Sequence, residues 1–171
     1  MRKLLDTLYN AAAWAAAFFM IGILLMVLAS VAGRQFGFYL RGSDAYAGYC
    51  MVAASFLALA HTLRRGEHIR VTLFLERFGA KVRHRLELWC HAVATVFTAV
   101  LAFYSVRLAY QSFIFNDISQ GNDATPLWIP QIGMALGAVI LFIAIVDDFV
   151  LHLHGRYKPH PQAAEELKLI E

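Results

Sequence analysis

The sequence predicts an all-α integral membrane protein with four transmembrane helices and both termini in the cytoplasm. The chain has 171 residues, of which 60% are hydrophobic and 16% are charged, and its mean hydropathy is +0.56. Soluble domains carry about 25% charged residues, and a soluble fold of this length has too little interior to bury so much apolar surface. Two further observations define the topology: four long stretches lack charges, and the basic residues gather on one side of these stretches.

Each charge-free stretch is long enough to cross a membrane. A hydrocarbon core about 30 Å thick requires about 20 helical residues, and backbone groups in lipid must be hydrogen-bonded within the segment. Barrel strands would alternate in polarity over about 10 residues, which these stretches do not. The four stretches have 27, 19, 19 and 23 residues and cover residues 7–33, 45–63, 88–106 and 124–146. We expect one four-helix domain over residues 1–171, with spans at about 8–33, 44–63, 86–111 and 129–151.

The first stretch is interpreted as a retained membrane helix. Its apolar length exceeds the roughly 7–15 residues of a signal-peptide core. Its alanine-rich part, residues 11–17, precedes the aliphatic core instead of following it.

The distribution of Lys and Arg predicts the orientation. Of the 15 basic residues, two lie at the N-terminus, seven lie between the second and third helices, and three lie in the C-terminal tail. Only Arg34 and Arg41 lie in the first connection, and Arg107 lies near the far end of the third helix. The positive-inside rule therefore places both termini and the middle connection in the cytoplasm.

The middle connection has the pattern of an amphipathic helix lying in the membrane plane over about residues 69–78. Its basic side chains fall away from one apolar face. An ordinary basic loop is the alternative interpretation. The apolar face would consist of Val71, Phe74, Leu75, Phe78 and Val82.

The entry to the fourth helix carries rigid and aromatic residues. Pro126 and Pro130 bracket residues 127–129, and proline is tolerated at helix starts because the N–H groups there have no intrahelical partner. Trp128 stands where interfacial aromatic anchors are expected. Gly133 and Gly137 are spaced for close helix packing, although such pairs also arise by chance.

The sequence contains no recognisable catalytic, metal or cofactor site. No Asp, Glu, Lys or Arg interrupts the middle of a predicted helix, whereas ion-coupled transport requires such groups in the membrane. His61 and His91 have similar expected depths, so a haem between their helices is conceivable, but hydrogen bonding at the interface is favoured. His152 is expected at or beyond the cytoplasmic surface.

Two other classes of function are disfavoured by the same pattern. The charges lie at the ends of apolar stretches and form no basic stripe, which argues against nucleic-acid binding. Cys50 and Cys90 are expected at different depths and therefore as free thiols.

Two motifs resemble the small membrane subunit of tripartite ATP-independent periplasmic (TRAP) transporters, the DctQ-like family. Residues 63–71, LRRGEHIRV, are similar to the family pattern Arg-x-Gly-x-His-Ile-x-Val. Residues 125–130, TPLWIP, are followed by Gly137 as in that family. A weaker similarity covers residues 33–36 and 41–44, where Asp44 stands in place of an acidic pair.

The resemblance implies a non-enzymatic transport subunit of the inner membrane, without a cofactor. Its implied partners are a large membrane subunit, which moves an organic acid together with sodium, and a periplasmic substrate-binding protein. The small subunit would brace the large one and offer periplasmic docking surface. The residues that the resemblance and the packing pattern single out are Arg65, Gly66, His68, Asp44, Pro126, Trp128, Pro130, Gly133 and Gly137.

Two alternatives remain open at the level of sequence. One is a haem-binding membrane anchor of a redox enzyme, and the other is a membrane protein of assembly or regulation.

Overall fold

The computed structural model describes residues 2–38, 40–65, 80–121 and 123–153, and it consists of four long helices. They are α1 (Arg2–Phe36), α2 (Ser43–Arg65), α4 (Ala80–Ile114) and α5 (Trp128–Leu153). Each is long and apolar enough to cross a membrane. Within these ranges the only β-type pairing is an isolated bridge between Ile118 and Pro126. The predicted all-α membrane fold with four spanning helices is therefore confirmed.

The helices α1 and α4 continue beyond the predicted spans. Each contains 35 residues, which corresponds to about 52 Å at 1.5 Å per residue. This exceeds the hydrocarbon thickness of about 30 Å. The polar and charged residues at their ends continue the helical hydrogen bonding outside the core, so a charge in the sequence marks the membrane boundary and not the helix boundary.

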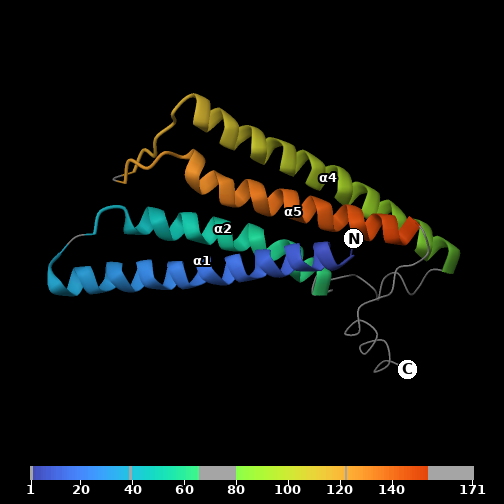
Figure 1. Cartoon of the computed structure of the whole chain (residues 1–171), viewed down its shortest axis with the longest axis horizontal. Helices are drawn as coiled ribbons and strands as arrows, with labels where there is room; N and C mark the ends of the chain where they lie inside the picture. The colour runs from blue at the N-terminus through green and yellow to red at the C-terminus, as the bar shows by residue number, and fades with distance from the viewer. Residues whose placement is uncertain (1, 39, 66–79, 122, 154–171) are drawn as a thin grey trace, which may run out of the picture.

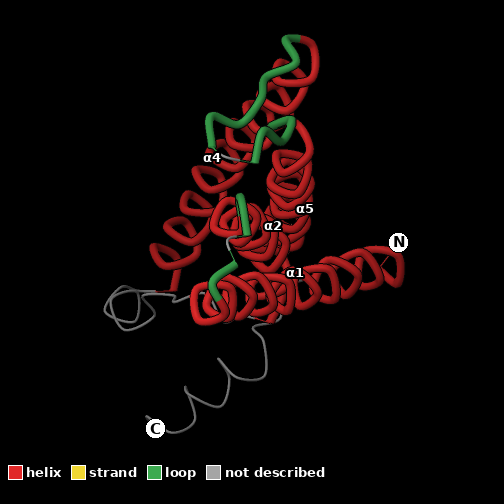
Figure 2. Tube along the Cα trace, turned by 90° about the vertical axis from the view of Figure 1, so that its left-hand side faces the viewer, coloured by secondary structure: helices red, strands yellow, loops and turns green. Residues whose placement is uncertain are grey.

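The helices form an open row in the order α1, α2, α5, α4. The first packs along α2, α2 packs along α5, and α5 packs along α4, whereas α1 touches α5 only slightly (Figures 1 and 2). The helices α2 and α5 therefore form the centre of the molecule, and α1 and α4 form its two edges.

Small side chains dominate the buried interior. Alanine supplies most of the buried hydrophobic residues, with Tyr9 as the largest side chain that is fully enclosed. Small residues allow close approach of helices, which is how membrane helices gain packing contacts. The buried positions of the centre are Ala53, Ala54, Leu57 and Ala60 on α2 and Ala135, Ala138, Leu141 and Ala144 on α5.

Large apolar side chains cover the outer faces of the two edges. Trp14 and Phe18 on α1 are 78% and 71% exposed, and Trp89 and Phe97 on α4 are 70% and 72% exposed. Such surface is stable in lipid or against another apolar protein surface. The edges therefore face the bilayer or a partner subunit.

The row has two distinct ends (Figure 1). We call the end with the connecting residues 37–42 and 115–127 the hairpin end. We call the other end, with the start of α1 and α4 and the last residues of α2 and α5, the terminal end. The expected in-plane helix at residues 69–78 and the C-terminal tail lie outside the described residues.

Candidate functional site

The two glycines of α5 set the distance between the central helices. A Cβ added at Gly137 would lie 2.5 Å from the backbone carbonyl carbon of Phe56, and one added at Gly133 would lie 2.8 Å from the Cβ of Ala53. Real Cβ atoms essentially never approach so closely. The obstacle at Gly137 is backbone, which cannot rotate away. The structure therefore uses this pair as the contact between α5 and α2.

A polar network joins the start of α2 to the α4–α5 loop. Tyr49 Oη donates a hydrogen bond to Asp123 Oδ2 at 2.9 Å, and Ser119 Oγ donates to Asp123 Oδ1 at 2.8 Å. Thr125 Oγ1 donates to Tyr46 Oη at 3.0 Å. The rings of Tyr46 and Tyr49 also meet edge to face, with centroids 6.0 Å apart. We call these five residues the hairpin clamp.

The backbone around the hairpin clamp is shaped to fit it. Gly42 has a φ of +78°, and a Cβ there would lie 2.7 Å from Asp123 Cβ, so both conformation and space favour glycine. The loop is closed by two backbone hydrogen bonds: Ser119 N donates to Thr125 O, and Leu127 N donates to Asp117 O, each at 2.9 Å. The connection between α4 and α5 is therefore built against α2.

Asp123 is the ionised centre of the hairpin clamp. Partial desolvation raises the pKa of its carboxyl group, but hydrogen bonds from Ser119, Tyr49 and Thr125 stabilise the carboxylate more strongly. The resulting pKa is about 2, below the ordinary value of 3.8. Asp123 therefore carries a negative charge at the hairpin end at neutral pH.

Asp44 lies at the start of α2, close to the hairpin clamp but not in it. It is the acidic residue of the first helical turn, where a negative charge complements the helix dipole. Ser30 Oγ on α1 donates a long hydrogen bond of 3.5 Å to Asp44 Oδ1. The neighbouring Ser43 Oγ donates to Leu40 O at 3.2 Å. Asp44 thus connects α1 and α2 at the hairpin end.

The aromatic and proline residues that begin α5 lie at the same end. Trp128 is the first residue of α5, and its ring meets Phe113 edge to face at 5.5 Å. Pro126 accepts a backbone hydrogen bond from Ile129 N at 3.2 Å. Pro130 lies in the first turn, where proline is tolerated. This start of α5 is therefore rigid and docked on the last turn of α4.

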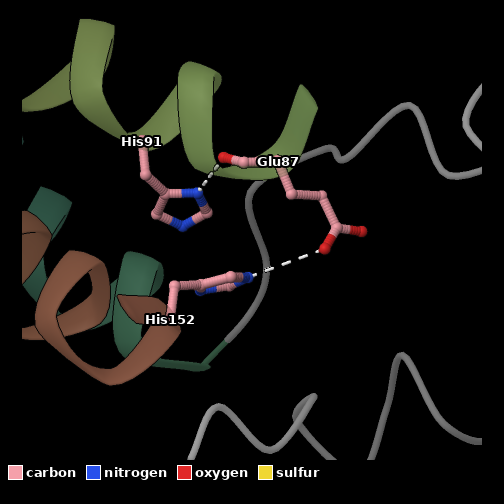
Figure 3. A network of polar contacts seen from close by, with 3 residues as sticks. All are labelled: Glu87, His91 and His152. Carbon is pink, nitrogen blue, oxygen red and sulfur yellow. Dashed lines mark hydrogen bonds and ion pairs between the residues drawn. The ribbon is translucent and has the colours of Figure 1, made fainter. Parts of the chain in front are cut away.

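At the terminal end, two histidines join α4 to α5 (Figure 3). His91 Nδ1 donates to the backbone oxygen of Glu87 at 2.8 Å, and His152 Nε2 lies 3.7 Å from Glu87 Oε2. The rings of His91 and His152 lie 4.3 Å apart between centroids, with an interplanar angle of 34°. His152 is only 5% exposed.

The structure gives each of these histidines a partner on the neighbouring helix, and the hydrogen bond of His91 agrees with the favoured interpretation from the sequence. The ring packed against His91 belongs to His152 and not to His61, because α5 lies between α2 and α4 in the row. His152 lies in the last turn of α5, at the terminal end, and is buried there between the helices. Equal depth in the membrane does not make two residues neighbours when another helix separates their elements.

The remaining sequence-predicted residues form no described site. Arg65 is the last residue of α2, while Gly66 and His68 lie outside the described residues. Among the described side chains, no three His, Cys, Asp or Glu residues are grouped as metal ligands. Cys50 and Cys90 are free thiols, as predicted.

Comparison with known proteins identifies one family. A family model described as "Tripartite ATP-independent periplasmic transporters, DctQ component" matches residues 23–155. This range contains all of α2, α4 and α5 and the second part of α1. A comparison with curated protein sequences gave no significant match.

Proposed function

The chain belongs to the DctQ family of TRAP transporter components, and we propose that it braces the large membrane subunit during sodium-coupled uptake of an organic acid. Membership makes the chain a multi-pass inner-membrane transporter subunit and not an enzyme. The family also implies two partners, the large membrane subunit and a periplasmic substrate-binding protein. The substrate class, the sodium coupling and the bracing role are the proposal.

The observation that carries the bracing role is the contrast between a tightly joined centre and uncharged spans. The centre is held by backbone-close contacts at Gly133 and Gly137 and by the hairpin clamp. No Asp, Glu, Lys or Arg occupies the middle of a described helix, and a charge kept at that depth normally serves transport. A chain with this pattern supports a transport path that another subunit provides.

The proposed orientation places the hairpin end in the periplasm. Twelve of the 15 basic residues lie in the termini or in residues 64–85, and the positive-inside rule assigns these segments to the cytoplasm. The hairpin end, with Asp44 and Pro126, would then offer the surface to which the substrate-binding protein docks.

The proposal gives the family motif at residues 63–71 a mechanical role at the cytoplasmic side. Arg65, Gly66 and His68 would set the angle between α2 and an in-plane helix at residues 69–78. Basic residues of such a helix gain about 1 kcal/mol each near anionic headgroups. This anchor would resist tilting of the brace when the large subunit moves.

The family match also decides between the alternatives. It identifies a transporter component, which favours the transport subunit over a haem-bearing anchor. The surroundings of His91 also favour the transport subunit over a haem-bearing anchor. The ring packed against His91 belongs to His152 and not to His61, which a haem between the two helices would need as its second ligand.

Reconstituted transport tests the proposal. Proteoliposomes would contain the large subunit with or without this chain, together with the substrate-binding protein and an inward sodium gradient. We expect uptake only when both membrane subunits are present, and none with this chain alone. Equal uptake by the large subunit without this chain would contradict the bracing role, and uptake without a sodium gradient would contradict the coupling.

A matched pair of variants connects uptake to the structure. Gly137→Leu places a side chain against the backbone of Phe56, whereas Gly48 on α2 has no atom within 4 Å of an added Cβ. We expect Gly137→Leu to reduce complex formation and uptake together, and Gly48→Leu to leave both near the wild-type level.

A further inference from the structure

An apolar groove runs along the junction of α4 and α5 at the hairpin end. Its volume is about 460 Å³. Its walls are apolar and aromatic, and most of these side chains are exposed in the chain by itself. The lining includes Val106, Tyr110 and Phe113 on α4 and Trp128, Ile132 and Val139 on α5.

The length of the groove corresponds to one leaflet of a bilayer. Trp128, at its mouth, is the first residue of α5, and Val139 lies eleven residues further along the same helix. Eleven helical residues cover about 16 Å, close to half of a 30 Å hydrocarbon core. The mouth is framed by the edge-to-face pair of Phe113 and Trp128 and by Tyr110, and such aromatics are typical of the headgroup level.

An arginine lies beside the groove. Arg107 is exposed, and it follows Val106 directly and precedes Tyr110 by one helical turn. Within the part of the chain that the structure describes, it forms no hydrogen bond or ion pair. Arg107 lies six residues, or about 9 Å, below Phe113 along α4. Long arginine side chains extend from such a depth to the interface, and the guanidinium group matches phosphate geometry.

We propose that this groove is a binding site for a glycerophospholipid of the leaflet at the hairpin end. One acyl chain lies between α4 and α5 from Trp128 to Val139, and the phosphodiester pairs with Arg107. The apolar wall accommodates the acyl chain, and the aromatic residues at the mouth lie at the level of the headgroup. Arg107 provides the positive charge that pairs with the phosphate.

The dimensions favour a lipid over a transmembrane helix of the partner as the occupant. A transmembrane helix is about 10–12 Å wide and crosses both leaflets, whereas the lining of the groove covers only about 16 Å along α5. The hairpin-end leaflet also meets few other cations of this chain, since the remaining basic residues at that end are Arg34 and Arg41. Of these three arginines, Arg107 is the one that neighbours the lining of the groove in the sequence.

Fluorescence quenching by brominated lipid tests this site directly. Replacing Trp14 and Trp89 by Phe, both of them exposed, leaves Trp128 as the only tryptophan of the full chain. This protein is reconstituted in vesicles of a phosphate-free glycosyl diacylglycerol that contain a minor share of acyl-brominated phosphatidylglycerol. A second set of vesicles has the same lipid proportions, but there the bromine is on the glycolipid and not on the phosphatidylglycerol.

We expect the brominated phospholipid to quench Trp128 more strongly than its share of the vesicle predicts. The mutation Arg107→Gln removes the phosphate partner and should lower the relative affinity for phosphatidylglycerol about tenfold. Arg107→Lys keeps the charge and should retain most of the preference. Arg34→Gln, on α1 at the same end but on the opposite edge, is the matched control and should change nothing.

Three results would overturn the assignment. The first is quenching in proportion to the bulk composition in both mixtures. The second is a phosphatidylglycerol preference that survives Arg107→Gln. The third is loss of the excess quenching when the large subunit is reconstituted with the chain, because the groove would then be covered by protein. Circular dichroism and size-exclusion profiles of each variant establish that it is folded.

Discussion

The central helices α2 and α5 and the edge helices α1 and α4 differ more in side-chain size than in hydropathy. The most apolar windows of α1 and α5 have similar mean hydropathies of 2.6 and 2.4, yet 6% of the first and 33% of the second is buried inside the chain. Glycine and alanine occupy the α5 contact, while Trp14 and Phe18 cover α1. In a membrane, residue size therefore indicates which helices pack together, whereas hydropathy indicates only that they are in lipid.

The largest effect is expected at the centre. Gly137→Leu forces a side chain against the backbone of Phe56, which rotamer changes cannot relieve, so the stability of the isolated chain should fall by about 3 kcal/mol. Thermal unfolding in detergent measures this loss. Gly48→Leu should unfold close to the wild-type temperature, and an equal loss in both variants would remove the distinction between packed and open glycines.

The hairpin clamp should contribute less, because it joins only one end of α2 to a loop. Tyr49→Phe removes the hydroxyl that donates to Asp123. We expect a smaller fall in melting temperature than for Gly137→Leu, and faster hydrogen exchange of the amides of Ser119 and Leu127. Tyr104→Phe is the control, because Tyr104 is exposed on α4. Unchanged exchange in Tyr49→Phe would show that the loop is held without the clamp.

The clamp also predicts a dependence on pH with a definite sign. The pKa of Asp123 is lowered from 3.8 to about 2 in the folded chain, so its contribution to stability is complete above about pH 4 and is lost as the pH falls through 2. The comparison is the difference in melting temperature between the wild type and Asp123→Asn at several pH values. This difference should shrink on acidification, and a difference that grows at low pH would contradict the assignment.

The smallest effect on the isolated chain is expected at the edges. Phe97→Leu alters a side chain that is 72% exposed on α4 and should change stability by less than about 0.5 kcal/mol. If the same substitution weakens co-purification with the large subunit, the exposed face of α4 around Phe97 is the face that meets the partner. A large loss of stability in the isolated chain would show that α4 is packed more tightly than its exposure indicates.

The parts of the structure that could be predicted from sequence are those with a local signal. Missing charges identify membrane segments because lipid penalises each charge separately, and the Gly133–Gly137 spacing marks a face because small residues recur on one side of a helix. The start of α5 was also identifiable, since Pro126 and Trp128 have strong positional preferences.

The parts that could not be predicted depend on contacts between distant segments. Tyr49 and Asp123 are 74 positions apart, and Tyr46 and Thr125 are 79 apart. Nothing in their local sequence distinguishes these four residues from ordinary interfacial ones. The same limit applies to the contact of His91 with His152, because the order of helices in the row is not encoded in helix length or hydropathy.

A distance measurement between the two edges tests the bracing role most directly. Cys50 and Cys90 are the only cysteines, so both are replaced by Ser, and spin labels are attached at Leu25→Cys on α1 and Phe97→Cys on α4, both exposed. The complex with the large subunit is then examined by pulsed electron paramagnetic resonance with and without sodium and the loaded substrate-binding protein. A rigid brace gives one distance distribution that stays the same under all conditions while labels on the large subunit move. A distribution that shifts or splits with sodium or with the binding protein would show that this chain moves with the transport cycle, and would contradict its role as a rigid brace.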